Sequence, residues 1–176
     1  MTCSATILDG AALASVVRRR HTGPMLKSVK AFIRRHLETG GERDGDSAAA
    51  STHLAVAALL VEVLRADFDV SIDERRHVLS SIQRLLDLDP AACDELLRVA
   101  EQQIDRSHDL YQFTSAINRS YSPEDKQRLL EELWRVAHAD ERLHKYEEHL
   151  IRRISDLLHL RHSEFIATKL RSRDPG

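Results

Sequence analysis

The sequence predicts an all-α fold, a single helical bundle of about seven helices built on a duplicated helical hairpin and preceded by an amphipathic helix and a linker. Three observations predict it. Apolar residues recur at helical spacing from residue 53 to residue 171, and no stretch alternates with period two for long enough to propose a strand. In Asp89-Pro90 and Ser122-Pro123, a capping side chain precedes proline at the first helical position. At 176 residues, the chain is long enough to bury one sizeable core.

Two segments of low periodicity are expected before the bundle. Residues 1–24 are interpreted as a disordered or non-native leader, with Met25 as an alternative translation start. Residues 38–52 concentrate three of the six glycines with charged and small side chains, and they are predicted to be a flexible linker.

Between these segments, residues 25–37 are predicted to form a basic amphipathic helix. Its apolar face includes Phe32 and Ile33, and its polar face carries no acidic residue. This pattern is typical of a helix that lies on an anionic membrane surface, docks on an acidic protein partner, or covers the acidic surface of its own bundle. The cations of the polar face are Lys27, Lys30, Arg34 and Arg35.

The bundle itself is expected over residues 53–171, followed by a short tail of residues 172–176. The first helix is apolar almost all round, as a helix at the centre of a bundle should be. The predicted helices lie near residues 53–66, 72–87, 90–105, 108–118, 123–139, 145–159 and 163–171.

Composition excludes several classes of function. The net charge of −2 lacks the basic character of a nucleic-acid-binding protein, although residues 1–37 carry seven cations and one acid, a net +6 that leaves −8 for the rest. Cys3 and Cys93 lie far apart without metal or redox spacing, which favours a reducing cytoplasm. No apolar stretch is long enough to span a bilayer, and no P-loop, dinucleotide fingerprint or nucleophile elbow occurs. We therefore expect a protein that is not an enzyme.

A repeat becomes visible when the chain is compared with itself. Residues 59–88 match residues 129–160 in pattern: an apolar helix ends in Ala-Asp, and a second amphipathic helix closes on Leu-Leu-x-Leu. Glu74 follows Asp67 by seven positions, and Glu147 follows Asp140 by the same seven. After each glutamate the registers differ by one residue, which indicates a one-residue insertion in the first copy.

The duplicated acids predict a cation site. An aspartate at the carboxyl end of a helix is unfavourable beside the helix dipole, so Asp67 and Asp140 require compensation. Two such hairpins packed about a pseudo-twofold axis would bring their carboxylates together with Glu74 and Glu147. An oxygen-rich site of this kind suits Ca²⁺, Mg²⁺ or Mn²⁺. The secondary ligands we consider are Asp69 and His144.

Two alternative interpretations of these acids remain open. Ser71 and Glu74 have the spacing of a capping box, which would explain Glu74 without a metal. Glu74-x-x-His77 and Glu141-x-x-His144 both have the E-x-x-H spacing of di-iron bundles, a weaker hypothesis because Glu141 falls in the connection between helices. An EF-hand is excluded, since Ile72 and Val78 stand where its loop needs Gly and Glu.

The two hairpin motifs, Ala66-Asp67-x-Asp69-x-x-x-x-Glu74 and Ala139-Asp140-x-x-x-x-x-x-Glu147, resemble the TerB family of tellurite-resistance proteins and the TerB-like domain at the amino end of the DjlA co-chaperones. The resemblance covers residues 53–171. It implies an all-α bundle, with the four acids at positions that the family uses for divalent cations. It also implies a bacterial stress-response module without enzymatic activity.

The sequence leaves three possible functions to compare. The first is a cytoplasmic, cation-binding adaptor with protein partners, which the resemblance places at the inner face of the membrane. The second is a purely structural, co-chaperone-like interaction domain in which the acids only cap helices. The third is a di-iron carboxylate protein.

Overall fold

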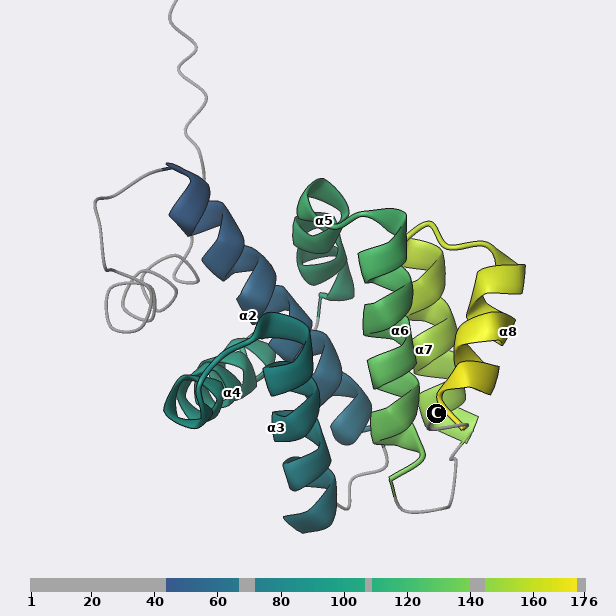
Figure 1. Cartoon of the computed structure of the whole chain (residues 1–176), viewed down its shortest axis with the longest axis horizontal. Coiled ribbons are helices and arrows are strands. Elements are labelled where there is room, and N and C mark those ends of the chain that lie inside the picture. The colour runs from purple at the N-terminus through teal and green to yellow at the C-terminus, as the bar shows by residue number, and fades with distance from the viewer. Residues whose placement is uncertain (1–43, 67–71, 107–108, 140–144, 174–176) are drawn as a thin grey trace, which may run out of the picture.

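A computed structural model of the chain describes residues 44–66, 72–106, 109–139 and 145–173 (Figure 1). The described residues form seven α-helices and no strand, which confirms the predicted all-α bundle. In chain order, the helices are α2 (Asp44–Leu64), α3 (Ile72–Leu86), α4 (Pro90–Ile104), α5 (Leu110–Ser120), α6 (Pro123–Ala137), α7 (Lys145–Leu157) and α8 (His162–Arg171).

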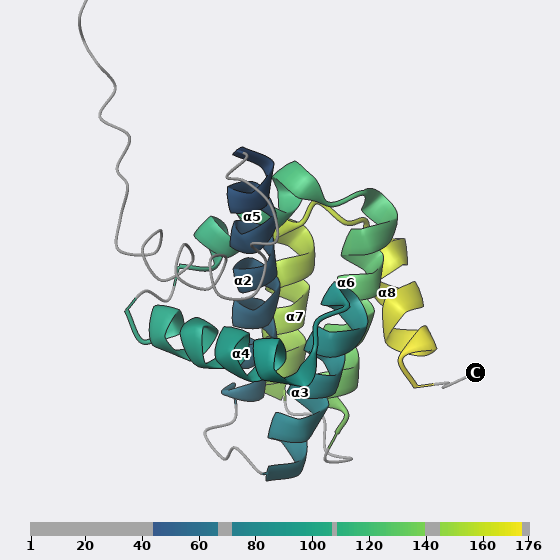
Figure 2. The ribbon, with the colours of Figure 1, turned by 60° about the vertical axis from the view of Figure 1, so that its left-hand side comes forward.

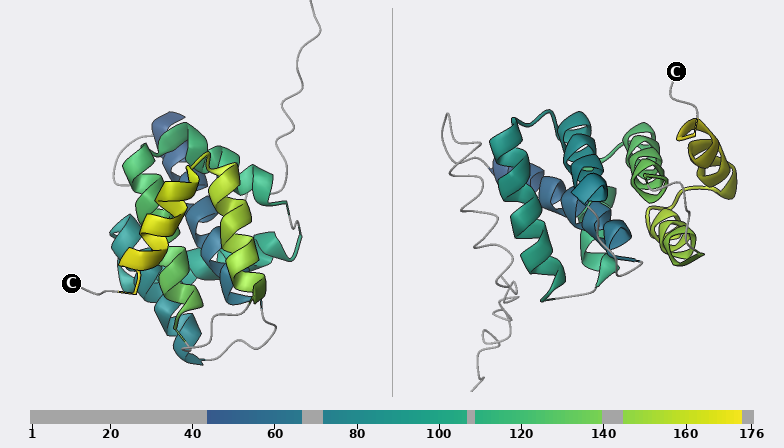
Figure 3. Two further views of the ribbon diagram at one scale, coloured as in Figure 1. Left: turned by 90° about the vertical axis from the view of Figure 1, so that its right-hand side faces the viewer. Right: turned by 90° about the horizontal axis from the view of Figure 1, so that it is seen from below.

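Helix α2 runs through the middle of the bundle and contacts α3, α4, α5, α6 and α7 (Figures 1 and 2). From Leu54 to Leu64, every residue except Glu62 is buried. This helix therefore occupies the central place that its all-round apolar sequence predicts. Helices α4 and α8 lie on opposite sides of the molecule (Figures 1 and 3).

The start of α2 corrects one prediction. The helix begins at Asp44, so the predicted linker 38–52 is wrong over residues 44–52, which are helical. Its glycines, its small and charged side chains and its lack of apolar periodicity predict a linker, but residues 48–50 are three alanines, the residue with the highest helix propensity.

Tertiary contacts also hold this early part of α2 in place. Ala50 and Thr52 are buried. The Thr52 hydroxyl donates a hydrogen bond to the Ala48 carbonyl at 3.0 Å, and its Oγ1 lies 2.9 Å from Ser120 Oγ at the end of α5. Packing against α5 therefore extends the helix beyond the residues whose periodicity predicted it.

The other helices begin and end within two residues of their predicted positions, and the two proline caps explain part of this agreement. The side chain of Asp89 accepts a hydrogen bond from the Ala92 N–H at 3.0 Å, which caps α4. Ser122 Oγ accepts from the Asp125 N–H at 3.1 Å, which caps α6. Both caps satisfy backbone donors that the first turn of a helix leaves without partners.

The ends of α3 and α7 explain the recurring Leu-Leu-x-Leu pattern. The variable position is Asp87 in the first copy and His159 in the second, and both residues have left-handed backbone, with φ of 51° and 61°. The Asp87 N–H bonds the Gln83 carbonyl, and the His159 and Leu160 N–H groups bond those of Asp156 and Ser155. The leucine that follows is buried in the second copy (Leu160) and partly buried in the first (Leu88). A left-handed residue followed by an apolar contact is a standard helix stop, so the repeat preserves its stop signal.

These two positions give a first testable prediction. Replacing Asp87 or His159 with glycine should raise the free energy of unfolding by about 0.5–1 kcal/mol, because left-handed backbone is costly for residues with a Cβ and free of that cost for glycine. Urea denaturation of each variant measures the change. Asp87→Val is the matched control and should destabilise; a stabilised valine variant would contradict the assignment of a left-handed helix stop.

Helix α8 is fixed to the bundle through Trp134 of α6. Trp134 is fully buried and meets the Phe165 ring edge-to-face, with the ring centroids 5.3 Å apart. Two cations cover these rings: Lys169 Nζ lies 4.7 Å from the centroid of Trp134, and Arg152 Cζ lies 4.5 Å from that of Phe165. This aromatic pair therefore links α6, α7 and α8.

Candidate functional site

The structure places Glu74 and Glu147 at equivalent positions in the two hairpins. Each is the third residue of its helix, α3 or α7, and each follows the last residue of the preceding helix, Leu64 or Ala137, by ten positions. The sequence repeat is thus a structural repeat of two helix pairs, α2–α3 and α6–α7. The extra residue expected in the first copy lies between Glu74 and the left-handed Asp87.

The two glutamates lie toward the same end of the bundle. Helices α2 and α6 contact each other and both end at the lower edge of Figure 1, where α3 and α7 begin; Figure 2 shows the same arrangement. Glu74 is 8% exposed and Glu147 is 7% exposed. Each side chain lies in the first turn of its helix, at the positive end of the helix dipole. One end of the bundle therefore carries a pair of buried, oxygen-bearing side chains.

The remaining members of the predicted site lie outside the described residues. These are Asp67, Asp69, Asp140 and His144. Within the part of the chain that the structure describes, no three His, Cys, Asp or Glu side chains are grouped so that they could hold a metal ion. The capping-box interpretation of Glu74 also stays open, since Ser71 is likewise outside the described ranges.

The geometry disfavours the di-iron hypothesis in the copy that can be inspected. Di-iron bundles need both residues of the E-x-x-H motif to project into the core. Glu74 is buried, but His77 is exposed. The first E-x-x-H motif therefore does not direct both of its side chains into the core, as a di-iron site requires.

A buried acid that sequence reasoning missed lies between α3 and α6. Glu132 is 4% exposed. Its Oε2 accepts hydrogen bonds from Ser81 Oγ at 2.8 Å and Arg84 Nη2 at 2.7 Å, and its Oε1 accepts from Arg84 Nε at 3.2 Å and from Arg135. Both oxygens are occupied, so Glu132 clamps two helices together and is not available as a metal ligand.

The electrostatics of Glu132 agree with this role. Burial alone would raise the pKa of its carboxyl, but the hydrogen bonds from Arg84 and Ser81 and the charges of Arg84 and Arg135 outweigh burial and lower the pKa. The sequence does contain a signal for it: Glu132 lies three residues after Leu129 and four before Val136, on the apolar side of its helix.

The predicted contact residues of the basic helix all fall outside the described residues. They are Lys27, Lys30, Phe32, Ile33, Arg34 and Arg35. Among the helices that the structure describes, none combines the length and the apolar character needed to cross a membrane.

Comparison with known proteins identifies a family. The family model described as tellurite resistance protein TerB matches residues 53–170, which include both hairpins. No curated protein and no solved structure matches the chain.

Proposed function

Because the chain belongs to the TerB family of tellurite resistance proteins, we propose that it is a non-enzymatic module that binds a divalent cation and acts as an adaptor. The observation that supports this proposal most directly is the structural repeat. Two buried glutamates occupy the same position in two helical hairpins, at the same end of the bundle.

The donor chemistry fits a hard cation. Carboxylate oxygens are the preferred ligands of Ca²⁺, Mg²⁺ and Mn²⁺. In this proposal, Glu74 and Glu147 hold the cation together with Asp67 and Asp140, and Asp69 and His144 are secondary ligands. A bound cation would tie the two hairpins to each other.

The adaptor part of the proposal rests on the basic helix predicted over residues 25–37. Its apolar face and its four cations match an acidic protein partner or the anionic inner face of a membrane. We propose a cytoplasmic protein in which this helix makes the contact, while the opposed hairpins sense the cation.

The cation proposal predicts a thermal shift. When the chelated full chain is titrated with Ca²⁺, Mg²⁺, Mn²⁺ or Zn²⁺, one of the hard cations should raise the melting temperature by about 5–10 °C at about a hundredfold excess over its Kd, because a ligand that binds only the folded state stabilises it. Asp67→Asn with Asp140→Asn should abolish the shift. Thermal unfolding followed by circular dichroism measures it.

A matched pair of substitutions distinguishes binding from general charge effects. Asp94 and Asp156 are exposed aspartates on α4 and α7, and Asp94→Asn with Asp156→Asn removes the same charge as the site variant. This control should keep the full shift. If no cation shifts the wild type, or if the site variant shifts as far as the wild type does, the acids are helix caps and the structural interaction domain becomes the better reading.

A further inference from the structure

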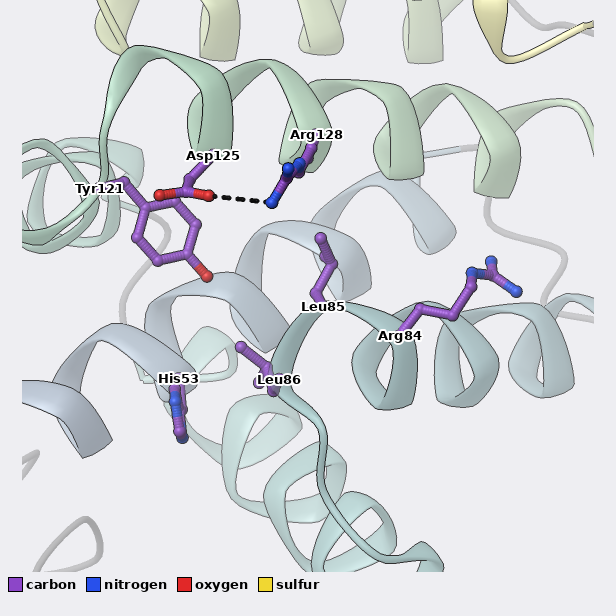
Figure 4. Close-up of a pocket in the computed structure, with 7 residues that line it drawn as sticks. All are labelled: His53, Arg84, Leu85, Leu86, Tyr121, Asp125 and Arg128. Atoms are coloured by element: carbon purple, nitrogen blue, oxygen red, sulfur yellow. Dashed lines mark hydrogen bonds and ion pairs between the residues drawn. The ribbon is translucent and has the colours of Figure 1, made fainter.

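A second feature of the bundle lies away from the hairpin acids. A cavity of about 330 Å³ opens where α2, the carboxyl end of α3, and the beginning of α6 meet (Figure 4). The cavity lies at the carboxyl end of α3 and the amino end of α6, which is the end of the bundle opposite to Glu74 and Glu147 (Figure 1). Its lining residues are His53, Arg84, Leu85, Leu86, Tyr121, Asp125 and Arg128.

The lining has an apolar floor and a polar rim. Leu85 and Leu86 are half-buried in the last turn of α3, and Figure 4 shows them between His53 on one side and the α6 residues on the other. The Tyr121 hydroxyl points toward Leu86, and the Arg128 guanidinium lies above Leu85. The cavity volume is at the lower end of the range for small-molecule sites.

Two hydrogen-bond donors on this rim are available to a ligand. The ion pair of Arg128 with Asp125 is long, at 3.5 Å, and the Arg128 side chain is 75% exposed, so its guanidinium keeps donors to spare. Burial and the nearby Asp125 charge raise the pKa of Tyr121 to about 12, so its hydroxyl stays protonated and can donate.

The other polar side chains of the lining either already bind other protein groups or carry no charge. Arg84 binds Glu132 with two nitrogens and points away from the centre of the cavity (Figure 4). Asp125 accepts from Ser122 Oγ at 2.8 Å and pairs with Arg128. Burial lowers the pKa of His53, which keeps its ring neutral at pH 7. The lining thus offers an apolar surface with one donor-rich corner, formed by Tyr121 and Arg128.

We propose that this cavity binds a small organic carboxylate, with its apolar body against Leu85 and Leu86 and its carboxylate hydrogen-bonded to the Tyr121 hydroxyl and the Arg128 guanidinium. The guanidinium matches a carboxylate because its planar N–H groups bind both oxygens. The apolar floor favours an organic anion over inorganic phosphate, which has no apolar part. This site is independent of the cation proposal, since no residue is shared between the two.

The test uses benzoate as the probe and full-length protein in the chelated state. Benzoate should shift the methyl resonances of Leu85 and Leu86 in NMR titrations up to about 20 mM, with a Kd on the order of 1 mM for so small a ligand. Arg128→Gln should weaken binding about tenfold, and Tyr121→Phe about fivefold, because each removes a donor to a charged acceptor. Benzamide, the neutral isostere, should bind at least about tenfold more weakly.

Arg76→Gln is the matched control. Arg76 is 71% exposed and pairs with Asp73 three residues earlier, as Arg128 pairs with Asp125, but it does not line the cavity. This variant should bind benzoate like the wild type. The proposal is overturned if benzoate leaves both leucines unmoved, if Arg128→Gln binds as tightly as Arg76→Gln, or if benzamide or inorganic phosphate produces the same shifts as benzoate.

Discussion

Replacing Trp134 with alanine is expected to lower the free energy of unfolding by about 4 kcal/mol, the largest effect of any single change considered for this protein. The side chain is fully buried, and its ring contacts Phe165 and Lys169 of α8. Its removal would leave a cavity under α8 and would end both ring contacts at once. Because Trp134 is the single tryptophan of the chain, urea denaturation must be followed by circular dichroism.

The phenylalanine variant tests how much of this cost comes from ring packing. Among the described residues, nothing accepts a hydrogen bond from the buried Trp134 Nε1–H. Trp134→Phe removes this unpaired donor and keeps most of the ring, so it should cost only about 1–2 kcal/mol. A cost for phenylalanine close to that for alanine would contradict this expectation, because it would mean that the remaining ring restores none of the packing against α8.

Replacing Glu132 with glutamine is expected to cost about 2–4 kcal/mol at neutral pH. The amide keeps the shape of the side chain but removes the charge that holds Arg84 and Arg135, and it leaves the buried Ser81 hydroxyl with a weaker partner. Glu124→Gln provides the control, since Glu124 is an exposed acid on the same helix, and it should change stability by less than about 0.5 kcal/mol.

The cost of Glu132→Gln should also depend on pH. The folded-state pKa of Glu132 is lowered, so the carboxylate contributes its full stabilisation above the unfolded value of about 4.3. That contribution is lost as the pH falls through the lowered pKa. The stability difference between wild type and variant should therefore be constant above about pH 5.5 and shrink toward pH 3 in urea titrations. A difference that does not change with pH would contradict a charged role for Glu132.

Local signals made most of the fold predictable. Capping residues before proline mark the starts of α4 and α6, and the left-handed stop after Leu-Leu marks the ends of α3 and α7. Both signals depend on only a few neighbouring residues. The start of α2 was missed because part of its support, the Thr52 contact with Ser120, comes from a residue 68 positions later in the chain. The spacing of apolar residues within a segment carries no information about a contact with a residue so distant in the sequence.

The functional regions were predictable to different extents. The repeat of Glu74 and Glu147 could be found by comparing the chain with itself, and the structure places the two residues at equivalent positions. Their burial was not predictable from the repeat. Glu132 and the cavity beside Tyr121 could not be found in this way. Their partners come from separate helices, such as Ser81 of α3 for Glu132, and their proximity depends on how the helices pack.

The central position of α2 bears on how the two copies of the hairpin can evolve. One copy contributes the helix that the whole bundle surrounds, since α2 contacts α6 and α7 of the other copy as well as α3, α4 and α5. Loss of either copy would expose the apolar surface of this shared helix to water. Despite their common pattern, the two halves are thus not exchangeable modules. A substitution in α2 must be compatible with the residues of both copies that pack against it, so the two copies must evolve together.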